Sequence, residues 1–217
     1  APVLDLRRPE TTGAIGDRAF SDDPAIVAAL GLAACRGLLA GGVIPIIKHM
    51  PGHGRATVDS HLELPKVVVD RLTLLATDFL PFTALDTMSW GMTAHILYTA
   101  FDADFPATHS PTVIESVIRG RLGFSGFLAS DDICMEALKG DISVRAARAL
   151  AAGCDVVLHG NGNLVAMEQV AAGARSLDEV ALKRLQRSEV MRRMSDSPDD
   201  IDENEMLAKL DSLLARS

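Results

Sequence analysis

The chain has 217 residues, of which 48% are hydrophobic, enough for one sizeable domain. Its formal net charge of −8 argues against a nucleic-acid partner, because binding to a phosphate backbone usually needs a basic surface. No apolar run approaches the roughly 18 residues that a membrane-spanning helix needs, so we expect no membrane partner. Cys35, Cys134 and Cys154 lie in apolar contexts without metal-ligand spacing, which predicts buried free thiols in a reducing compartment.

Strand and helix signals alternate along the chain. Apolar runs predict strands at residues 2–5, 43–48, 91–96, 126–130 and 154–159. Helices are expected at about 24–40, 71–80, 110–122, 143–152, 164–172 and 176–194. The alternation predicts an α/β fold, in which helices cover a parallel sheet. We expect residues 1–194 to form this domain, 195–205 to be an acidic linker, and 206–217 to form a C-terminal helix. The sequence pattern places this helix at about residues 204–215, so it would overlap the end of the linker.

Each predicted strand ends in polar residues. These are Asp5, Lys48-His49, His95, Ser130-Asp131-Asp132 and His159-Gly160-Asn161. The carboxyl ends of the strands of an α/β barrel open onto one face, so we expect one shared pocket there. A complete (β/α)8 barrel has eight strands, so the pattern predicts either the last five strands of a TIM-type barrel or an open sheet. Because the chain starts with Ala1 and enters a strand directly, we expect it to be part of a longer polypeptide.

Asp131 is the first candidate for catalysis. A carboxylate at the mouth of an apolar strand is partly desolvated but can still reach a substrate, which suits a nucleophile or an electrostatic stabiliser. The alternative is that Asp131 or Asp132 caps the helix that follows.

Asp59 and His61 are the second candidate, in a Gly-rich loop. A carboxylate that accepts from one ring nitrogen fixes the tautomer and raises the basicity of the other nitrogen, as a general acid/base requires. The alternative is a polar surface loop.

The segment Lys48-His49 allows more than one chemistry. The two side chains could bind substrate hydroxyls, Lys48 could form a Schiff base as in a class I aldolase, and His49, His53, Asp59 and His61 could together bind zinc. The zinc spacing matches no standard motif, and Pro51-Gly52-His53-Gly54 is better explained as a segment that shapes the loop.

Three further residues have open roles. Arg18, in the loop after the first strand, is either a forked donor to substrate or a solvated charge. His95 is expected to be a core histidine with its hydrogen bonds satisfied, and His109 is expected at the surface.

A run of residues through the chain resembles a known family. Lys48-His49-Met50-Pro51-Gly52-His53-Gly54, then Asp59-Ser60-His61 and Leu64-Pro65, are similar to the signature of bacterial β-N-acetylhexosaminidases of glycoside hydrolase family 3. Within that family the similarity is to the cytoplasmic enzymes that recycle cell-wall muropeptides. Further matches, in the family's order over about residues 1–165, are Ala1-Pro2-Val3-Leu4-Asp5, Ile15-Gly16-Asp17-Arg18, Met92-Thr93-Ala94-His95 and Ser130-Asp131-Asp132.

The resemblance implies a cytoplasmic (β/α)8 barrel that removes terminal N-acetylglucosamine with retention from a small carbohydrate or muropeptide. It implies Asp131 as the nucleophile, His61 polarised by Asp59 as the acid/base, and no cofactor or metal. It also implies that Arg18, Lys48 and His49 hold the sugar hydroxyls. The family's upstream Asp-Gln-Glu-Gly-Gly-Arg segment does not occur in this sequence.

Two other functions compete with this reading. One is a Lys48 Schiff-base aldolase on the same barrel, and the other is a non-catalytic sugar-binding fragment. We expect a monomer unless another chain supplies the barrel strands that this sequence lacks.

Overall fold

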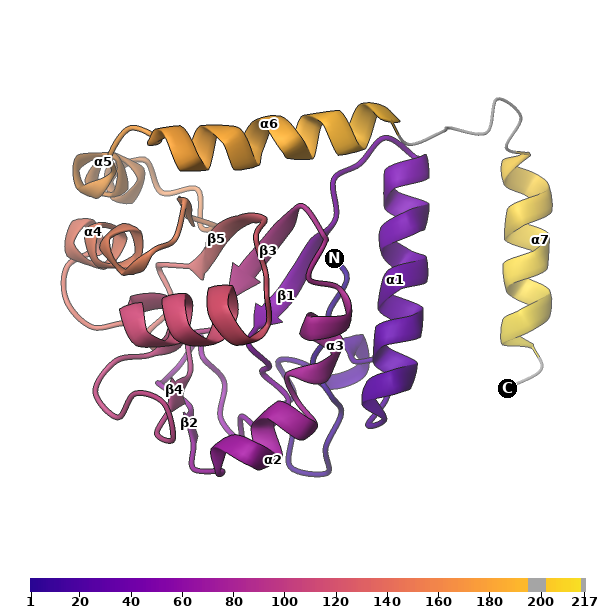
Figure 1. The fold of residues 1–217 in the computed structure, drawn as a ribbon, viewed down its shortest axis with the longest axis horizontal. Helices are drawn as coiled ribbons and strands as arrows, with labels where there is room; N and C mark the ends of the chain where they lie inside the picture. The colour runs from indigo at the N-terminus through magenta and orange to yellow at the C-terminus, as the bar shows by residue number, and fades with distance from the viewer. Residues whose placement is uncertain (195–201, 216–217) are drawn as a thin grey trace.

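The computed structural model describes residues 1–194 and 202–215. At its centre is a parallel sheet in the order β1-β3-β5-β6 (Figure 1). The strands are β1 (Ile46–Met50), β3 (Trp90–Thr93), β5 (Phe127–Asp132) and β6 (Val156–Leu158). All three pairings are parallel and follow chain order, which confirms the α/β prediction. The predicted strand 2–5 is reduced to a single parallel bridge between Val3 and Lys48.

Helices α1 to α6 surround this sheet, and α7 lies apart from it (Figure 1). The bounds of these helices are α1 (Pro24–Ala40), α2 (Arg71–Ala76), α3 (Leu80–Ala84), α4 (Ile142–Ala152), α5 (Leu164–Gly173), α6 (Glu179–Met194) and α7 (Glu203–Leu214). Shorter or wider helical turns are η1 (Gly16–Arg18), η2 (Ala107–His109) and the π-helix η3 (Thr112–Arg121). In the described ranges, no helix combines the length and apolar character needed to cross a membrane.

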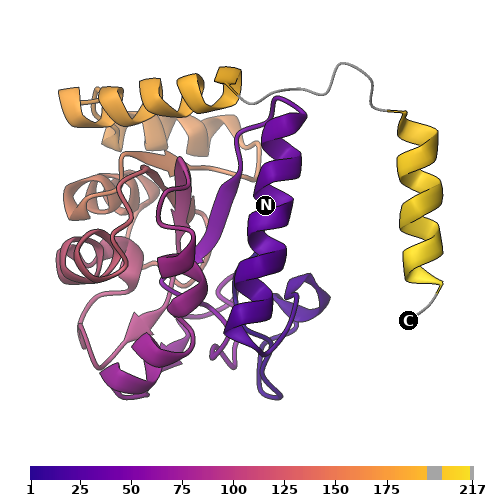
Figure 2. The same ribbon diagram turned by 45° about the vertical axis from the view of Figure 1, so that its right-hand side comes forward.

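Helix α1 has the bounds that its sequence predicts. The Asp23 carboxylate accepts from the backbone N–H groups of Ala25 and Ile26, Pro24 occupies the first turn, and the helix ends at Gly41. Figure 2 shows α1 running beside β1. Helix α6 crosses the amino ends of the strands (Figure 1). Arg187 on this helix donates to the carbonyl of Ser125, which lies just before β5. The opposite, carboxyl end of the sheet is therefore open to the loops that carry the candidate residues.

Among the described residues, the largest cluster of the core is mainly aliphatic, and two small clusters accompany it. The largest cluster includes Leu4, Ile47, Phe79, Phe82 and Leu128, each almost completely buried. This burial agrees with an apolar, aromatic-poor composition, in which only 4% of residues are aromatic.

A second small parallel sheet was not predicted. It pairs β2 (Lys66–Val67) with β4 (Leu97–Tyr98). Two-residue strands carry too little periodicity to be recognised in a sequence. The pairing brings Tyr98 beneath the loop that follows β1, where its hydroxyl donates to the Gly52 carbonyl at 2.8 Å.

Several predictions of local structure were wrong. The expected helix 71–80 is split into α2 and α3: Pro81 lies in the first turn of α3, and a proline cannot continue a helix from the residues before it. Between the two helices, Asp78 accepts from Arg55. His109 is not at the surface: it is 7% exposed, and its Nε2 donates to the Arg145 carbonyl. Cys134 is half-buried rather than buried, whereas Cys35 and Cys154 are buried free thiols as expected.

The predicted C-terminal helix, expected to start at about residue 204, is present as α7 (Glu203–Leu214). Helix α7 begins at Glu203, so residues 203–205 of the predicted linker 195–205 are helical. Residues 195–201 lie outside the described residues. None of the residues in α7 is buried, and the helix lies apart from the sheet in Figures 1 and 2.

Candidate active site

The loop after β1 is held by close backbone contacts. Gly54 packs so tightly against the backbone of Leu6 that a Cβ atom at this position would overlap the Leu6 carbonyl oxygen. Gly52 has φ +149°, and an added Cβ would lie 2.8 Å from the Asp78 carbonyl oxygen. Thr11 donates its hydroxyl to the Gly54 carbonyl at 2.6 Å. Glycines are therefore needed here because the loop is pressed against neighbouring segments.

At the base of this loop, His49 lies between two carboxylates. Its Nδ1 is 2.7 Å from Asp5 Oδ2, and its Nε2 is 3.9 Å from Asp131 Oδ2. Asp5 is fully buried and Asp131 is 7% exposed. Asp131 stands at the end of β5, where one of its oxygens accepts from the backbone N–H of Asp132 at 2.9 Å. The structure thus brings the predicted residues His49 and Asp131 together in one buried cluster.

Asp5 completes this cluster, and sequence reasoning did not include it among the site residues. In addition to its contact with the His49 ring, the Asp5 carboxylate accepts hydrogen bonds from the backbone N–H groups of His49 (3.2 Å) and His53 (2.6 Å). Burial alone would raise the pKa of Asp5, but the charge and hydrogen bond of His49 and the contacts with His53 lower it below its usual range. The position of Asp5 at the end of the first predicted strand was the signal that could have identified it.

Two other histidines support the cluster. His53 is 2% exposed, its ring lies edge-on to His49 with centroids 5.5 Å apart, and burial lowers its pKa to about 4. His95 is fully buried, and its pKa is lowered by that burial. One ring nitrogen of His95 lies 2.7 Å from the Thr108 hydroxyl and the other 3.0 Å from the Asp132 carbonyl. The prediction of a satisfied core histidine is confirmed, and its contact holds the backbone next to Asp131.

Asp59 and His61 form the second cluster. The Asp59 Oδ1 atom lies 2.7 Å from His61 Nδ1 and also accepts from the His61 backbone N–H at 2.9 Å. That backbone hydrogen bond is the main reason why the pKa of Asp59 is lowered. The His61 side chain is 59% exposed and is therefore accessible from solvent.

The segment that carries His61 is attached to the chain beyond Asp131. The carbonyl of Ser60 accepts from the Ala137 N–H at 3.2 Å, and that of His61 accepts from the Glu136 N–H at 3.3 Å. The two clusters therefore lie at the same end of the sheet, although no hydrogen bond or ion pair joins His61 to Asp131 directly.

Of the predicted sugar-binding residues, the cations Lys48 and Arg18 form no side-chain hydrogen bond or ion pair with His49 or Asp131 in the described part of the chain. Lys48 is half-buried, and its backbone pairs with the first segment through Leu4, whose N–H donates to the Lys48 carbonyl at 2.7 Å. Arg18 is exposed, and its guanidinium donates to the carbonyl of Ala14. Burial and the nearby charges of Lys48 and Arg18 lower the pKa of the Ala1 amino group, so both cations lie near Ala1. The structure does not bring Arg18 into contact with Asp131.

The four proposed zinc ligands do not converge. Asp5 engages Nδ1 of His49, Asp59 engages Nδ1 of His61, and His53 is enclosed. Across residues 1–194 and 202–215, no group of three or more His, Cys, Asp or Glu side chains is arranged to hold a metal ion.

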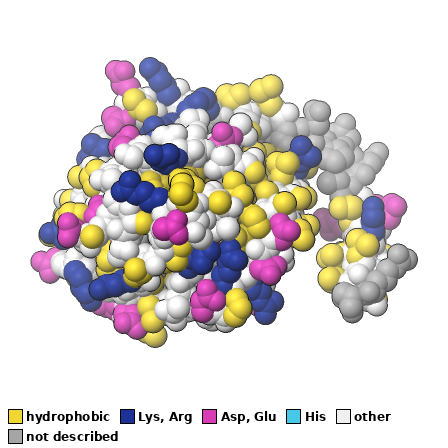
Figure 3. Space-filling model, turned by 60° about the horizontal axis from the view of Figure 1, so that its bottom comes forward, with side chains coloured by type: hydrophobic (Ala, Val, Ile, Leu, Met, Phe, Trp, Pro, Cys, Tyr) yellow, Lys and Arg dark blue, Asp and Glu magenta, His cyan; other side chains and the backbone are white. Residues whose placement is uncertain are grey.

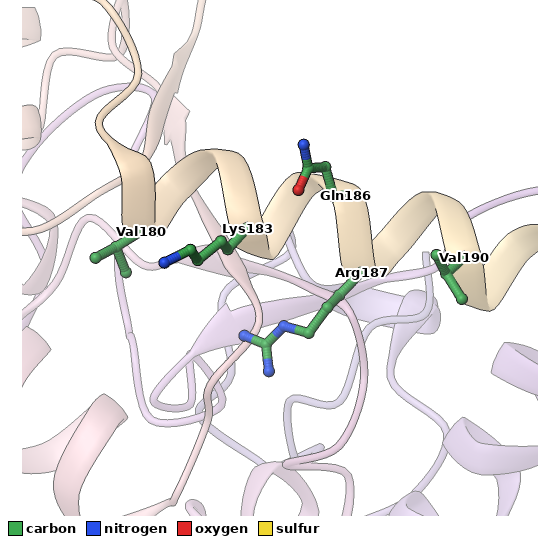
Figure 4. A pocket seen from close by; sticks show the side chains of 5 residues that line it. All are labelled: Val180, Lys183, Gln186, Arg187 and Val190. Atoms are coloured by element: carbon green, nitrogen blue, oxygen red, sulfur yellow. The ribbon is translucent and has the colours of Figure 1, made fainter.

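The surface offers other hollows. One of about 550 Å³ lies along α6, lined by Val180, Lys183, Gln186, Arg187 and Val190 (Figure 4). It is at the amino ends of the strands and so lies away from Asp131. The face in Figure 3 shows acidic and basic side chains interspersed among hydrophobic ones, without a field of one sign.

Comparisons with known proteins agree with this arrangement. The model of the glycosyl hydrolase family 3 N terminal domain matches residues 1–194. A beta-hexosaminidase of Xanthomonas campestris pv. campestris is 42% identical over 186 residues, which are 84% of this chain and 55% of that protein. The chain thus spans about half the length of the curated relatives it matches.

Solved structures give the same result. NagZ from Neisseria gonorrhoeae in complex with N-trifluoroacetyl-D-glucosamine is 35% identical with a TM-score of 0.76, covering 87% of this chain and 54% of that chain. Zinc-bound CbsA from Thermotoga neapolitana is 32% identical with a TM-score of 0.70, covering 97% of this chain and 47% of that chain. The family signature predicted from the residues is confirmed: this chain belongs to glycosyl hydrolase family 3, through the N-terminal domain of that family.

Proposed function

We propose that this chain carries the catalytic residues of a retaining exo-β-N-acetylglucosaminidase. Its substrates would be muropeptide-type glycosides and its location the cytoplasm, where cell-wall fragments are recycled. The observation that carries the proposal is the pair of clusters at one end of the sheet, Asp131 with His49 and Asp59 with His61. The names of the relatives in family 3 support the substrate class.

The parallel sheet would be an arc of a (β/α)8 barrel. Its strands lie in chain order with their carboxyl ends together, as right-handed βα crossovers around one axis require. The proposed sugar-binding residues, Arg18, Lys48 and His49, would then face the sugar from neighbouring segments.

In the first step, an oxygen of Asp131 attacks the anomeric carbon while the bond to the leaving oxygen breaks. His61 Nε2 donates a proton to that oxygen, and Asp59 stabilises the ring through Nδ1. In the second step, His61 accepts a proton from water, whose oxygen displaces Asp131 from the anomeric carbon. Two inversions give net retention, and both residues return to their starting states.

The test uses the intact protein and an aryl β-N-acetylglucosaminide. The wild type should hydrolyse it, and Asp131→Ala should abolish turnover while its circular dichroism spectrum stays unchanged. A 2-fluoro sugar should label Asp131 covalently, as peptide mass spectrometry would show. Asp132→Ala is the matched control, since Asp132 adjoins Asp131 and accepts from the Cys134 N–H at 3.0 Å. Labelling at Asp132 would contradict the assignment.

A further inference from the structure

The contacts of Asp5 fix its orientation toward His49. Its Oδ1 accepts from the backbone N–H groups of His49 and His53, and its Oδ2 faces His49 Nδ1 at 2.7 Å. An ionised carboxylate has no hydrogen to donate, so the hydrogen of this last contact belongs to Nδ1. The Nε2 atom of His49 is then the one that faces Asp131, at 3.9 Å.

The titratable groups around His49 come from every segment packed against it. Asp5 faces it from the first segment, His53 from the loop after β1, His95 from beyond β3, and Asp131 from β5. Burial lowers the pKa of His53 to about 4 and also lowers that of His95, so both rings are neutral near neutral pH. Among the described residues, His49 makes the only ion pairs to Asp5 and Asp131.

The charge on His49 then influences whether the carboxylate of Asp131 is ionised. A neutral His49 with its hydrogen on Nδ1 would turn the Nε2 lone pair toward the Asp131 carboxylate. A second proton on Nε2 replaces that repulsion by attraction and places a cation between two buried carboxylates. We propose that Asp5 is a positioning residue that holds His49 doubly protonated, so that His49 keeps Asp131 ionised for nucleophilic attack. The role of Asp131 rests on the proposed function, whereas the protonation of His49 does not.

The first experiment needs no activity. Long-range ¹H–¹⁵N correlation spectra of the ¹⁵N-labelled chain at pH 7 report whether each histidine nitrogen carries a proton, and His49→Gln assigns the signals. We expect both nitrogens of His49 to be protonated in the wild type. A wild-type His49 with a single proton would overturn the proposal, even if no variant folds.

The variant Asp5→Asn sharpens this test. The asparagine oxygen can still accept from the two backbone N–H groups, but its NH2 group now faces Nδ1, which must become an acceptor. We expect a neutral His49 with its proton on Nε2. The matched control is Asp59→Asn, the same change beside His61, which should alter the His61 signals and leave those of His49 unchanged.

The second experiment uses the pH profile of kcat/KM. A cation within about 4–6 Å of a carboxylate typically moves its titration by 1–3 units, so Asp5→Asn should move the acidic limb upward by about one unit or more. His49→Gln should give a similar shift, and the double variant should add nothing, because Asp5 acts through His49. The acidic limb of this pH profile reports the titration of Asp5, His49 and Asp131 as one coupled group and not of any single residue.

A merely structural role for Asp5 gives a different result. Asp5→Asn would then lower kcat/KM by the same factor at every pH, and the double variant would lose activity additively. A wild type that hydrolyses the glycoside but whose limb does not move in Asp5→Asn would overturn this inference and leave the proposed function intact. A wild type without activity, but with doubly protonated His49, would overturn the proposed function and leave the Asp5–His49 pairing intact.

Discussion

Acid should destabilise this protein through two buried histidines, His53 and His109. Burial lowers the pKa of each to about 4 from an ordinary value of 6.5. A group whose pKa is lower in the folded state binds its proton preferentially in the unfolded state. Its contribution to stability is therefore fully present above pH 6.5 and is lost as the pH falls toward 4.

The size of the effect follows from these values. One pKa unit corresponds to about 1.4 kcal/mol, so between pH 7 and pH 5 each histidine should remove about 2 kcal/mol from the free energy of unfolding. The two together should remove about 4 kcal/mol, a large share of the roughly 5–15 kcal/mol that holds a typical domain folded. His95, whose pKa is also lowered by burial, adds a loss of the same sign. The lowered pKa values of Asp5 and Asp59 add their losses only at lower pH, since carboxylates titrate below this window.

The assay is urea unfolding at pH 7, 6 and 5, followed by the fluorescence of Trp90, the single tryptophan. In His109→Gln, the side-chain amide can still donate to the Arg145 carbonyl but does not titrate, so the loss of about 2 kcal/mol that His109 contributes between pH 7 and pH 5 should disappear. The comparison variant is His61→Gln, because the His61 side chain is 59% exposed and not buried. If His109→Gln shows the same loss as the wild type, burial does not keep this ring neutral and the reasoning is refuted.

Three further predictions concern the proposed chemistry. His61→Ala should slow glycosides with poor leaving groups at least tenfold more than activated aryl glycosides, and Asp59→Ala should do so more weakly; an equal loss on both classes would assign His61 to binding. Prolonged EDTA treatment should leave activity unchanged, whereas one equivalent of zinc retained on His49 or His61 would argue for a metal centre. Borohydride with a carbonyl substrate should not label Lys48, and a labelled Lys48 peptide would favour the aldolase reaction.

The fold could be predicted where its signals are local. Helix α1 has a side-chain cap, a proline in its first turn and a terminal glycine, all within the helix and its neighbours, and the structure has the predicted bounds. The predicted helix 71–80 was wrong although a local signal was present, since Pro81 favours a new helix start and not the continuation of an existing helix. His109 was misplaced for a different reason, since its enclosing partner is the distant carbonyl of Arg145 on α4. No local pattern reports such distant partners.

The two histidine–carboxylate pairs show the same limit. Asp59 and His61 are two residues apart, so the pair is visible in the sequence, whereas Asp5 and His49 are 44 residues apart and meet only because their segments are parallel neighbours. The pairs also differ physically: the His61 ring is 59% exposed and that of His49 is 6% exposed. An exposed ring can exchange protons with a leaving group and with water, as an acid/base must. A ring enclosed between two carboxylates exchanges less readily. In the mechanism that we propose, the two pairs would therefore have different tasks because they lie at different depths in the fold.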